Sequence, residues 1–327
     1  MVLGVDVGGT KVAVAAVDGV TVQTAVEHPT LTASTESLLD GIEAAVRDMI
    51  GRAGQPDAIG VGVPSQIEYS TGTVETSVNI PLTGVPLREE LGRRFGVPVF
   101  VDNDANCAAL AEAHLLGEDH LVMLTLGTGV GGGVVIDGMT FRGAHGLGAE
   151  LGHITLNPDG PPCPDSCPNR GCVEAYCSGQ ALERDATELA SDKPDSRLAR
   201  AIGADGKVSG PELVQAAEDG DSDALLIFDN FARMLGIAIA AYVNVFEPDR
   251  LALGGGLSRA SHLFLDRAVQ EAGARALPAL WRRTNIALAQ GGADAGVIGA
   301  AVLAAQEIQQ DLRDTPRPPA ATTERAE

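Results

Sequence analysis

The chain begins with VLGVDVGGTKVAVAAVD at residues 2–18, where two runs of small apolar residues flank the pair Gly8-Gly9. Valines recur along both runs, a pattern typical of buried strands. Two such runs separated by a glycine pair are typical of neighbouring strands joined by a tight turn. The stretch therefore predicts a strand, a glycine turn and a second strand.

The same layout returns further along the chain, where HLVMLTL is followed by GTGVGG and then GVVIDG, residues 120–138. We interpret these segments as a second strand, glycine turn and strand. A layout that occurs twice predicts an internal structural repeat. The repeat in turn predicts two α/β domains that face each other across a cleft, which is where ligands usually bind.

The remaining segments alternate between strand and helix patterns. We predict strands at residues 57–64, 97–104 and 249–253, and helices at 35–52, 105–117 and 295–310, with helices dominating 178–247. This alternation is typical of the α/β class. The last segment, 311–327, holds three prolines among polar residues, and we expect it to be a disordered tail.

The composition excludes several classes of protein. The 327 residues carry a formal net charge of −21, which opposes binding to nucleic acid or to an anionic membrane. The N-terminus lacks the features of a signal peptide, and no run of 18 or more apolar residues predicts a membrane span. We therefore expect a cytoplasmic protein, in which cysteines serve as thiols or metal ligands.

The first glycine turn is a candidate phosphate site. Glycines allow a positive φ and a close approach of backbone N–H groups to a phosphate, here at Gly8 and Gly9. Thr10 adds a hydroxyl, Lys11 a cation, and Asp6 could hold a metal-bound water near the phosphates. The alternative is a plain hairpin turn. The segment is not a Walker A loop, because Thr10 stands where that motif requires lysine.

Two further glycine turns follow predicted strands. The segment GTGVGGG, 127–133, contains a literal GxGxxG, but a strand and not a helix comes next, so we reject a dinucleotide-binding fingerprint. Gly127, Thr128 and Gly129 fit a second phosphate clamp better. The third turn, Gly254-Gly255-Gly256, could lie flat against a nucleotide base or ribose.

Several polar residues are candidates for chemistry. Asn103 and Asp104 lie between a predicted strand and helix, where a carboxylate can accept a proton from an attacking hydroxyl. The alternative is that Asp104 only caps the helix. Glu150 and His153 are three residues apart and would face the same way on a helix or turn. A carboxylate can accept two sugar hydroxyls, and the imidazole can bind a sugar or a metal.

A cluster of cysteines follows His153. Three thiolates and one imidazole make a common closed zinc site, and we predict His153, Cys163, Cys167 and Cys172 as the ligands, with Cys177 as the alternative. The alternative is that these cysteines form disulfide bonds, which a reducing cytosol disfavours. The zinc would be structural, holding the loop that leads to Glu174.

Four motifs together resemble the ROK family of repressors and sugar kinases, and among its members the bacterial glucokinases. They are DVGGTK at 6–11, VDNDAN at 101–106, TLGTGVGGG at 125–133, and GAELGH at 148–153 with GCVE at 171–174. The resemblance runs from about residue 2 to 308. It implies that the sugar contacts Asn79, Asn103, Asp104, Glu150, His153 and Glu174.

The resemblance also implies the architecture and the cofactors. It implies two actin-like (ribonuclease H-like) α/β domains around a cleft, with mixed sheets flanked by helices. Residues 1–116 with 296–310 would form the small domain, and 117–295 the large domain with the zinc loop. ATP with Mg²⁺ would be bound beside the structural Zn²⁺, and the protein would be a homodimer or homotetramer.

The chain departs from the family pattern at three places. The usual C-x-C-G-x-x-G-C pattern is altered, because Asp165 takes the first cysteine position, Cys163 lies two residues earlier, and Pro168 replaces a glycine. Ser65-Gln66 stands where a glycine is usual near the sugar, which affects the prediction of specificity. Ala149 replaces a usual glycine before Glu150, a change that we expect to be tolerated.

The resemblance thus predicts an enzyme that transfers phosphate from ATP to glucose, giving glucose 6-phosphate with Asp104 as general base. Kinases for fructose, mannose, an N-acetylhexosamine or allose remain alternatives, as does polyphosphate as donor. A sugar-sensing regulator of the family is the alternative from another class. Such regulators carry an N-terminal DNA-binding segment, for which we expect no room before Asp6.

Overall fold

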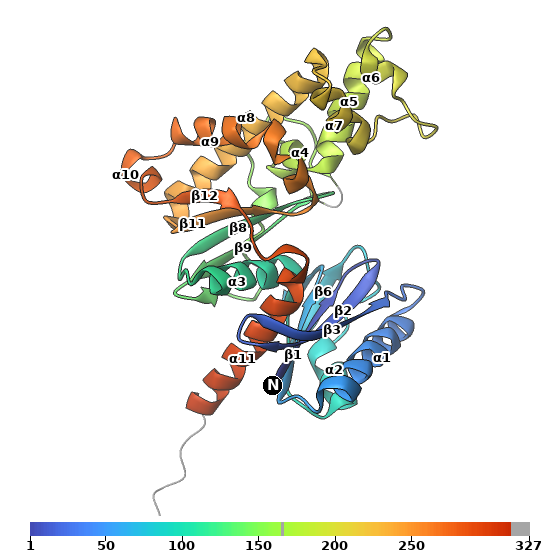
Figure 1. The fold of residues 1–327 in the computed structure, drawn as a ribbon, viewed down its shortest axis with the longest axis vertical. Helices are drawn as coiled ribbons and strands as arrows, with labels where there is room; N and C mark the ends of the chain where they lie inside the picture. The colour runs from blue at the N-terminus through green and yellow to red at the C-terminus, as the bar shows by residue number, and fades with distance from the viewer. Residues whose placement is uncertain (165–166, 315–327) are drawn as a thin grey trace, which may run out of the picture.

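The computed structural model describes residues 1–164 and 167–314 of the chain. Two α/β halves lie one above the other, each built on its own five-stranded sheet (Figure 1). The two sheets have the same layout, an antiparallel three-stranded meander extended by two parallel strands. The repeat predicted from the two glycine turns is thus present, and the predicted fold of mixed sheets flanked by helices is confirmed.

The first sheet has the order β3-β2-β1-β4-β7, formed by β1 (Val2–Val7), β2 (Lys11–Asp18), β3 (Thr21–Pro29), β4 (Ala58–Val63) and β7 (Val99–Asn103). On one face α1 (Thr35–Ala53) and α2 (Leu87–Phe95) pack against it, and their apolar residues share a core with the strands. The final helix, α11 (Ala295–Asp314), packs on the other face. A small hairpin of β5 (Ser65–Glu68) and β6 (Thr73–Ser77) follows β4.

The second sheet has the order β10-β9-β8-β11-β12, formed by β8 (Leu121–Leu126), β9 (Val130–Ile136), β10 (Met139–Thr140), β11 (Arg250–Gly254) and β12 (Asn285–Leu288). Helices cover one of its faces: α4 (Glu174–Cys177), α5 (Gly179–Asp192), α6 (Arg197–Arg200), α7 (Gly210–Glu218), α8 (Ser222–Phe246), α9 (Leu265–Gly273) and α10 (Pro278–Trp281). Short 3₁₀ turns lie at Leu151–His153, Gly256–Leu263 and Gly292–Asp294.

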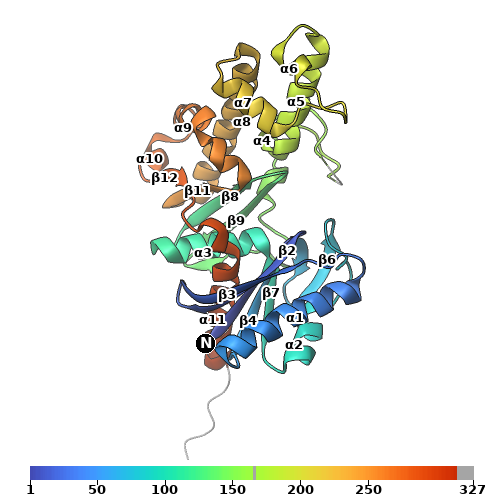
Figure 2. The same ribbon diagram turned by 45° about the vertical axis from the view of Figure 1, so that its right-hand side comes forward.

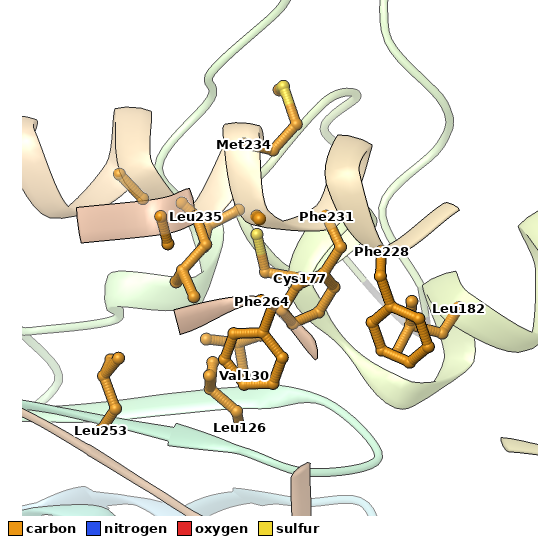
Figure 3. Packing of buried hydrophobic residues seen from close by; sticks show 14 of the residues in the cluster. Leu126, Val130, Cys177, Leu182, Phe228, Phe231, Met234, Leu235, Leu253 and Phe264 are labelled. Carbon is orange, nitrogen blue, oxygen red and sulfur yellow. The ribbon is translucent and has the colours of Figure 1, made fainter. Parts of the chain in front are cut away.

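The core of the second half lies between these helices and the sheet. Phe231 of α8 meets Phe264 edge to face, with ring centroids 4.9 Å apart, above Leu126 and Val130 (Figure 3). Among the described residues one helix, α8, is long and apolar enough to cross a membrane. Since 61% of its apolar stretch is buried inside the protein, α8 has the burial of a core helix.

Both ribbon views place α3 (Asp104–Leu116) and the start of α11 between the two sheets (Figure 2). Glycines make this close packing possible. A Cβ at Gly60 would lie 1.7 Å from the carbonyl oxygen of Ala300, and one at Gly133 would lie 2.6 Å from the Cβ of Ala109. The structure corrects one prediction, because residues 130–132, which were predicted as part of the turn, belong to β9 together with the predicted strand from 133. These glycines are needed for contact with α3 and its neighbours rather than for turning the chain.

The prediction for the tail was wrong at its start. Residues 311–314 continue α11, as the sequence allows, since the first proline comes only at position 316. The rest of the predicted tail, 315–327, lies outside the described residues.

Candidate active site

A cleft of about 520 Å³ lies between the two halves. Its walls bring together most of the residues that the sequence singled out. From the first half come Ser65, Gln66, Asn79, Asn103 and Asp104, and from the second Gly127, Thr128, Gly129, Glu150, His153, Cys167, Glu174 and Gly255. Of the predicted nucleotide residues, the cleft lining in the described chain omits Asp6, Gly8, Gly9, Thr10, Lys11, Gly254 and Gly256.

The junction of β7 and α3 presents Asp104 to the cleft. Asn103 is the N-cap of α3, and its side-chain oxygen accepts hydrogen bonds from the N–H groups of Ala105 and Asn106, at 2.9 and 3.3 Å. Asp104 is the first residue of the helix and is half-buried. The capping role that was the alternative for Asp104 therefore belongs mainly to Asn103, although Asp104 Oδ1 also accepts from Ala105 N–H over 2.8 Å.

Burial and charge make Asp104 a better proton acceptor. Burial is the main cause that raises its pKa, and the carboxylate of Glu150 adds to the rise. The hydrogen bond from Ala105 N–H acts in the opposite direction. A carboxylate with a raised pKa holds a proton more readily, which is what a general base in phosphoryl transfer requires.

The first glycine turn lies beside the cleft, and it differs from the prediction. Neither Gly8 nor Gly9 adopts a positive φ, and the turn is closed by a hydrogen bond from Gly8 N–H to the Lys11 carbonyl over 2.9 Å. The Lys11 ammonium pairs with Glu27 on the neighbouring strand. Lys11 is thus held at the exposed start of β2. Gly9 has open space around it, so its backbone is accessible.

Asp6 is the buried charge of this turn. Burial raises its pKa to about 6, the nearby Asp104 adds to the rise, and Lys11 opposes it. Its carboxylate lies against the start of α11, where a Cβ on Gly296 would be 2.4 Å from Asp6 Oδ2. Two carboxylates that interact in this way, one of them in the cleft wall, are a favourable place for a cation.

We expect Asp6→Asn to stabilise the ligand-free protein at pH 8 by about 1–2 kcal/mol, because ionised Asp6 is penalised by burial and by Asp104. A raised pKa means that the folded protein keeps a proton that the unfolded chain releases near pH 4. The stability of the wild type should therefore fall as the pH rises through about 6. Urea unfolding of both proteins at pH 5 and pH 8 measures the effect, which should be about half as large at pH 5.

The exposed Asp18 at the end of β2 supplies the control for this test. Asp18→Asn should change the unfolding free energy by less than about 0.5 kcal/mol at both pH values. If Asp6→Asn is destabilising at pH 8, or if its effect does not depend on pH, Asp6 is not a penalised buried carboxylate.

The second glycine turn is held by the strand and helix that follow it. Gly127 N–H donates to the Gly129 carbonyl over 3.0 Å, and the Thr128 carbonyl accepts from Gln180 N–H over 3.2 Å. Thr128 is exposed to the cleft. A Cβ on Gly129 would lie 2.4 Å from Glu174 Oε2, so a side chain there would displace that carboxylate.

Glu174 is more deeply buried than a simple sugar ligand would be. It is 7% exposed, and its Oε2 accepts a hydrogen bond from Val130 N–H over 2.7 Å. Its other oxygen, Oε1, lies 4.0 Å from the sulfur of Cys163. Glu174 therefore links the second glycine turn to the cysteine loop while still lining the cleft.

Glu150 and His153 lie on a short 3₁₀ turn, which explains why residues three apart face the same way. Glu150 is exposed, and its Oε1 accepts a hydrogen bond from Gln66 Nε2 over 3.1 Å. The bond joins the first half of the molecule to the second. Ala149 has φ of 65°, in the left-handed region that favours glycine, so the departure from the family pattern costs some backbone strain.

The ligand atoms of His153, Cys163, Cys167 and Cys172 all lie within 4.8 Å of one another. Three thiols and an imidazole at this spacing fit a tetrahedral zinc site. All five cysteines, each of which the structure describes, are free thiols. Cys177, the predicted alternative ligand, ends α4 rather than starting a helix, and is buried in the core of the second half. The altered position Asp165 lies outside the described residues.

Sequence reasoning missed part of the site. Asp102 and Arg142 form a buried ion pair beside the cleft, and Gln180 and Val78 belong to its wall. The two charged residues are 40 positions apart, so no local pattern connects them. Asp102 could have been singled out, since it lies within VDNDAN.

Comparison with known proteins places the chain in a family. Residues 2–307 match the ROK family. A glucokinase of Thermotoga maritima is 34% identical over 312 residues, which cover 94% of this chain and 98% of that protein. An N-acetyl-D-glucosamine kinase of Aliivibrio salmonicida is 34% identical, covering 93% of this chain and 99% of that kinase.

A solved structure has the same fold. The crystal structure of a ROK family glucokinase from Streptomyces griseus, in complex with glucose and AMPPNP, superposes with a TM-score of 0.75. It is 35% identical, and the match covers 93% of this chain and 99% of that one. From the match over nearly its whole length, the chain belongs to the ROK family and resembles the family's bacterial glucokinases.

Proposed function

We propose that the protein is a kinase that transfers the γ-phosphoryl group of ATP to a hexose, with glucose as the first candidate. The observation that carries the proposal is the position of Asp104, a half-buried carboxylate with a raised pKa. It faces one cleft together with Glu150 and the second glycine turn. The similarity to glucokinases supports the same function.

In this mechanism the sugar binds in the cleft through Asn79, Asn103, Glu150, His153 and Glu174. Asp104 accepts the proton of the attacking hydroxyl, which we take to be the one on C6, giving glucose 6-phosphate. Holding that hydroxyl in line with the phosphate supplies most of the remaining catalysis, because phosphoryl transfer needs positioning and charge stabilisation.

The triphosphate is proposed to lie along the two glycine turns. The phosphates would be held by backbone N–H groups and hydroxyls of Gly8, Gly9, Thr10, Gly127, Thr128 and Gly129. Lys11 would lie near the negative charge of the phosphates. Gly254 to Gly256 would lie against the nucleoside. Asp6 would hold Mg²⁺ through a bound water, and the cation would neutralise charge on the phosphate oxygens. The electrostatic repulsion between the Asp6 and Asp104 carboxylates supports a cation bound near them.

The zinc is proposed to be structural, held by His153, Cys163, Cys167 and Cys172. The cluster orients His153 at the wall of the cleft and fixes the loop beside Glu174. We further propose that residues 1–116 with 296–310 form one domain and 117–295 the other, and that they close on the ligands and exclude water. A cytoplasmic homodimer or homotetramer completes the proposal, with no nucleic acid or membrane as partner.

A coupled assay of ADP release with ATP and Mg²⁺, run over a panel of hexoses, tests the function. Release with glucose at least tenfold faster than with fructose, mannose, allose and N-acetyl-D-glucosamine is the expected result. Preference for another hexose would keep the kinase and change its substrate. No ADP release from ATP with any of the sugars, together with no sugar phosphate formed when polyphosphate is the donor, would overturn the proposal.

Gln66 offers a test of specificity. We expect Gln66→Ala to raise the kcat/KM ratio of N-acetyl-D-glucosamine to glucose by about tenfold, because the change frees volume in the cleft and removes a donor from Glu150. A hydrogen bond to a charged group contributes about 1.5–3 kcal/mol. Since about 1.4 kcal/mol corresponds to a factor of ten, loss of this bond is large enough to change the ratio tenfold. Steady-state kinetics with both sugars gives the ratio.

Gln180 provides a matched control in the same cleft, because its backbone N–H donates to the Thr128 carbonyl of the second glycine turn. Gln180→Ala should change KM for ATP more than it changes the ratio between sugars. An unchanged ratio in Gln66→Ala would mean that Gln66 does not take part in choosing the sugar.

A further inference from the structure

Two buried charged residues beside the cleft have no part in the mechanism above. Asp102, on β7, is 3% exposed, and the side chain of Arg142 is 11% exposed. Arg142 Nε donates a hydrogen bond to Asp102 Oδ2 over 2.6 Å. Since an unpaired buried charge is costly, each residue depends on the other for its place.

Asp102 controls the turn that carries the proposed base. Its second oxygen, Oδ1, accepts hydrogen bonds from Asn103 N–H over 2.8 Å and from Asn106 Nδ2 over 2.9 Å. Asn103 caps α3, and Asp104 is the first residue of that helix. The carboxylate of Asp102 thus fixes the backbone from which Asp104 projects into the cleft.

Arg142 controls the segment that carries the proposed sugar ligand. It stands near the start of the loop 141–149, which leads directly to Glu150, and its carbonyl accepts from Gly148 N–H over 2.9 Å. Its guanidinium lies over the ring of Tyr69, 3.9 Å from the centroid. Tyr69 N–H also donates to the His145 carbonyl over 3.2 Å, so the loop is held against the end of β5.

The two sets of contacts meet at one ion pair. We propose that Arg142, paired with Asp102, is a positioning residue that fixes Asp104 relative to Glu150. The proposal rests on the proposed function, because it assigns the two fixed groups as proton acceptor and sugar ligand. A guanidinium can bond the carboxylate and stack on the ring at once, and an ammonium cannot reproduce both contacts.

Arg142→Gln is expected to lower kcat by about 10- to 100-fold and to raise KM for the hexose, because displacements near 1 Å at a reacting group have effects of this size. KM for ATP should stay within about twofold, since the second glycine turn is held by other contacts. Asp102→Asn should behave in the same way. Arg142→Lys should recover only part of kcat, because it keeps the charge without the ring contact.

A second buried pair supplies the control. Arg250, at the start of β11, donates through Nε and Nη2 to Glu118 Oε1 over 3.0 and 2.9 Å, and both side chains are at most 20% exposed. The opposite end of β11, at Gly254-Gly255, is the end near the cleft. Arg250→Gln should lower the melting temperature but leave kcat within about threefold, when both proteins are assayed well below their melting transitions.

Two results would overturn the proposal. One is an equal loss of kcat in Arg142→Gln and Arg250→Gln, which would indicate general destabilisation. The other is an Arg142→Gln enzyme whose kcat and hexose KM both remain within about threefold of the wild type.

Failure of the proposed function would be seen separately, as a wild type that releases no ADP with any hexose. Titration calorimetry with glucose then gives the readout, and Arg142→Gln should weaken binding about tenfold or more while Arg250→Gln should not. Equal affinities in the two variants, or a wild type that binds no hexose, would overturn the positioning role as well.

Discussion

Replacing Asp104 with asparagine is expected to lower kcat for hexose phosphorylation by about 10²- to 10⁴-fold, the usual contribution of a general base. Asparagine keeps the size of the side chain and an oxygen for the Ala105 N–H, but it cannot accept the proton of the attacking hydroxyl. The cap of α3 should persist, because Asn103 provides it. Steady-state kinetics should therefore show a loss in kcat with KM for both substrates changed much less.

A control for this variant is Asp221→Asn, at the N-cap of α8. Asp221 accepts hydrogen bonds from the N–H groups of Asp223 and Ala224, so it caps its helix as an aspartate can cap α3. Asp221 is not among the described residues that line the cleft. Since asparagine caps helices about as well as aspartate, this change should alter the stability by less than about 0.5 kcal/mol and leave kcat unaltered. Near-normal turnover by Asp104→Asn would show that another group accepts the proton or that no base is needed.

The second large effect is expected at the zinc cluster. Cys172→Ser should abolish stoichiometric zinc binding and lower the unfolding free energy by several kcal/mol, because structural zinc contributes about 10–16 kcal/mol of apparent binding free energy in small zinc domains. His153 belongs to the same cluster and lines the cleft, so KM for the hexose should rise by tenfold or more. Metal analysis of the purified protein, thermal denaturation and hexose kinetics measure the three effects.

Cys177→Ala separates the loss of metal from the loss of a buried cysteine. Cys177 is fully buried in the core and lies outside the cluster of ligand atoms. The variant should be destabilised by the truncation but should keep one zinc per chain. Full zinc content in Cys172→Ser would contradict the metal site, and zinc loss in Cys177→Ala would make Cys177 a ligand.

Much of the fold could be read from local patterns. The runs around Gly8-Gly9 and the second run from residue 120 predicted the repeated hairpins, because apolar alternation and glycine turns act over a few residues. The motif VDNDAN predicted the strand-to-helix junction, with the polar residues at the strand end. Gly131 and Gly132 were wrongly assigned to a turn, because they lie in β9, where a Cβ would meet Thr125 and Leu151 from other parts of the chain.

The candidate site was predicted as a set of residue types, and its arrangement was not. The sequence favoured Cys163 as a zinc ligand and left Cys177 as the alternative, and only the packing of α4 buries Cys177 away from the cluster. It offered Lys11 as a phosphate ligand, and it did not show that pairing of β2 with β3 brings the ammonium to Glu27. The residue types determine which chemical groups the chain can offer to a ligand. The distances between these groups depend on how the helices and strands pack.

The sequence by itself thus determined the repeated α/β elements, the family and the chemical groups available for binding and catalysis. Tertiary structure alone decided which polar and charged groups meet: Asp102 with Arg142 across 40 residues, Gln66 with Glu150 across 84, and Asp6 with Asp104 across the first sheet. Secondary structure follows from short-range sterics and apolar periodicity. Contacts between distant residues depend on how the whole chain packs, and local sequence patterns carry no record of it.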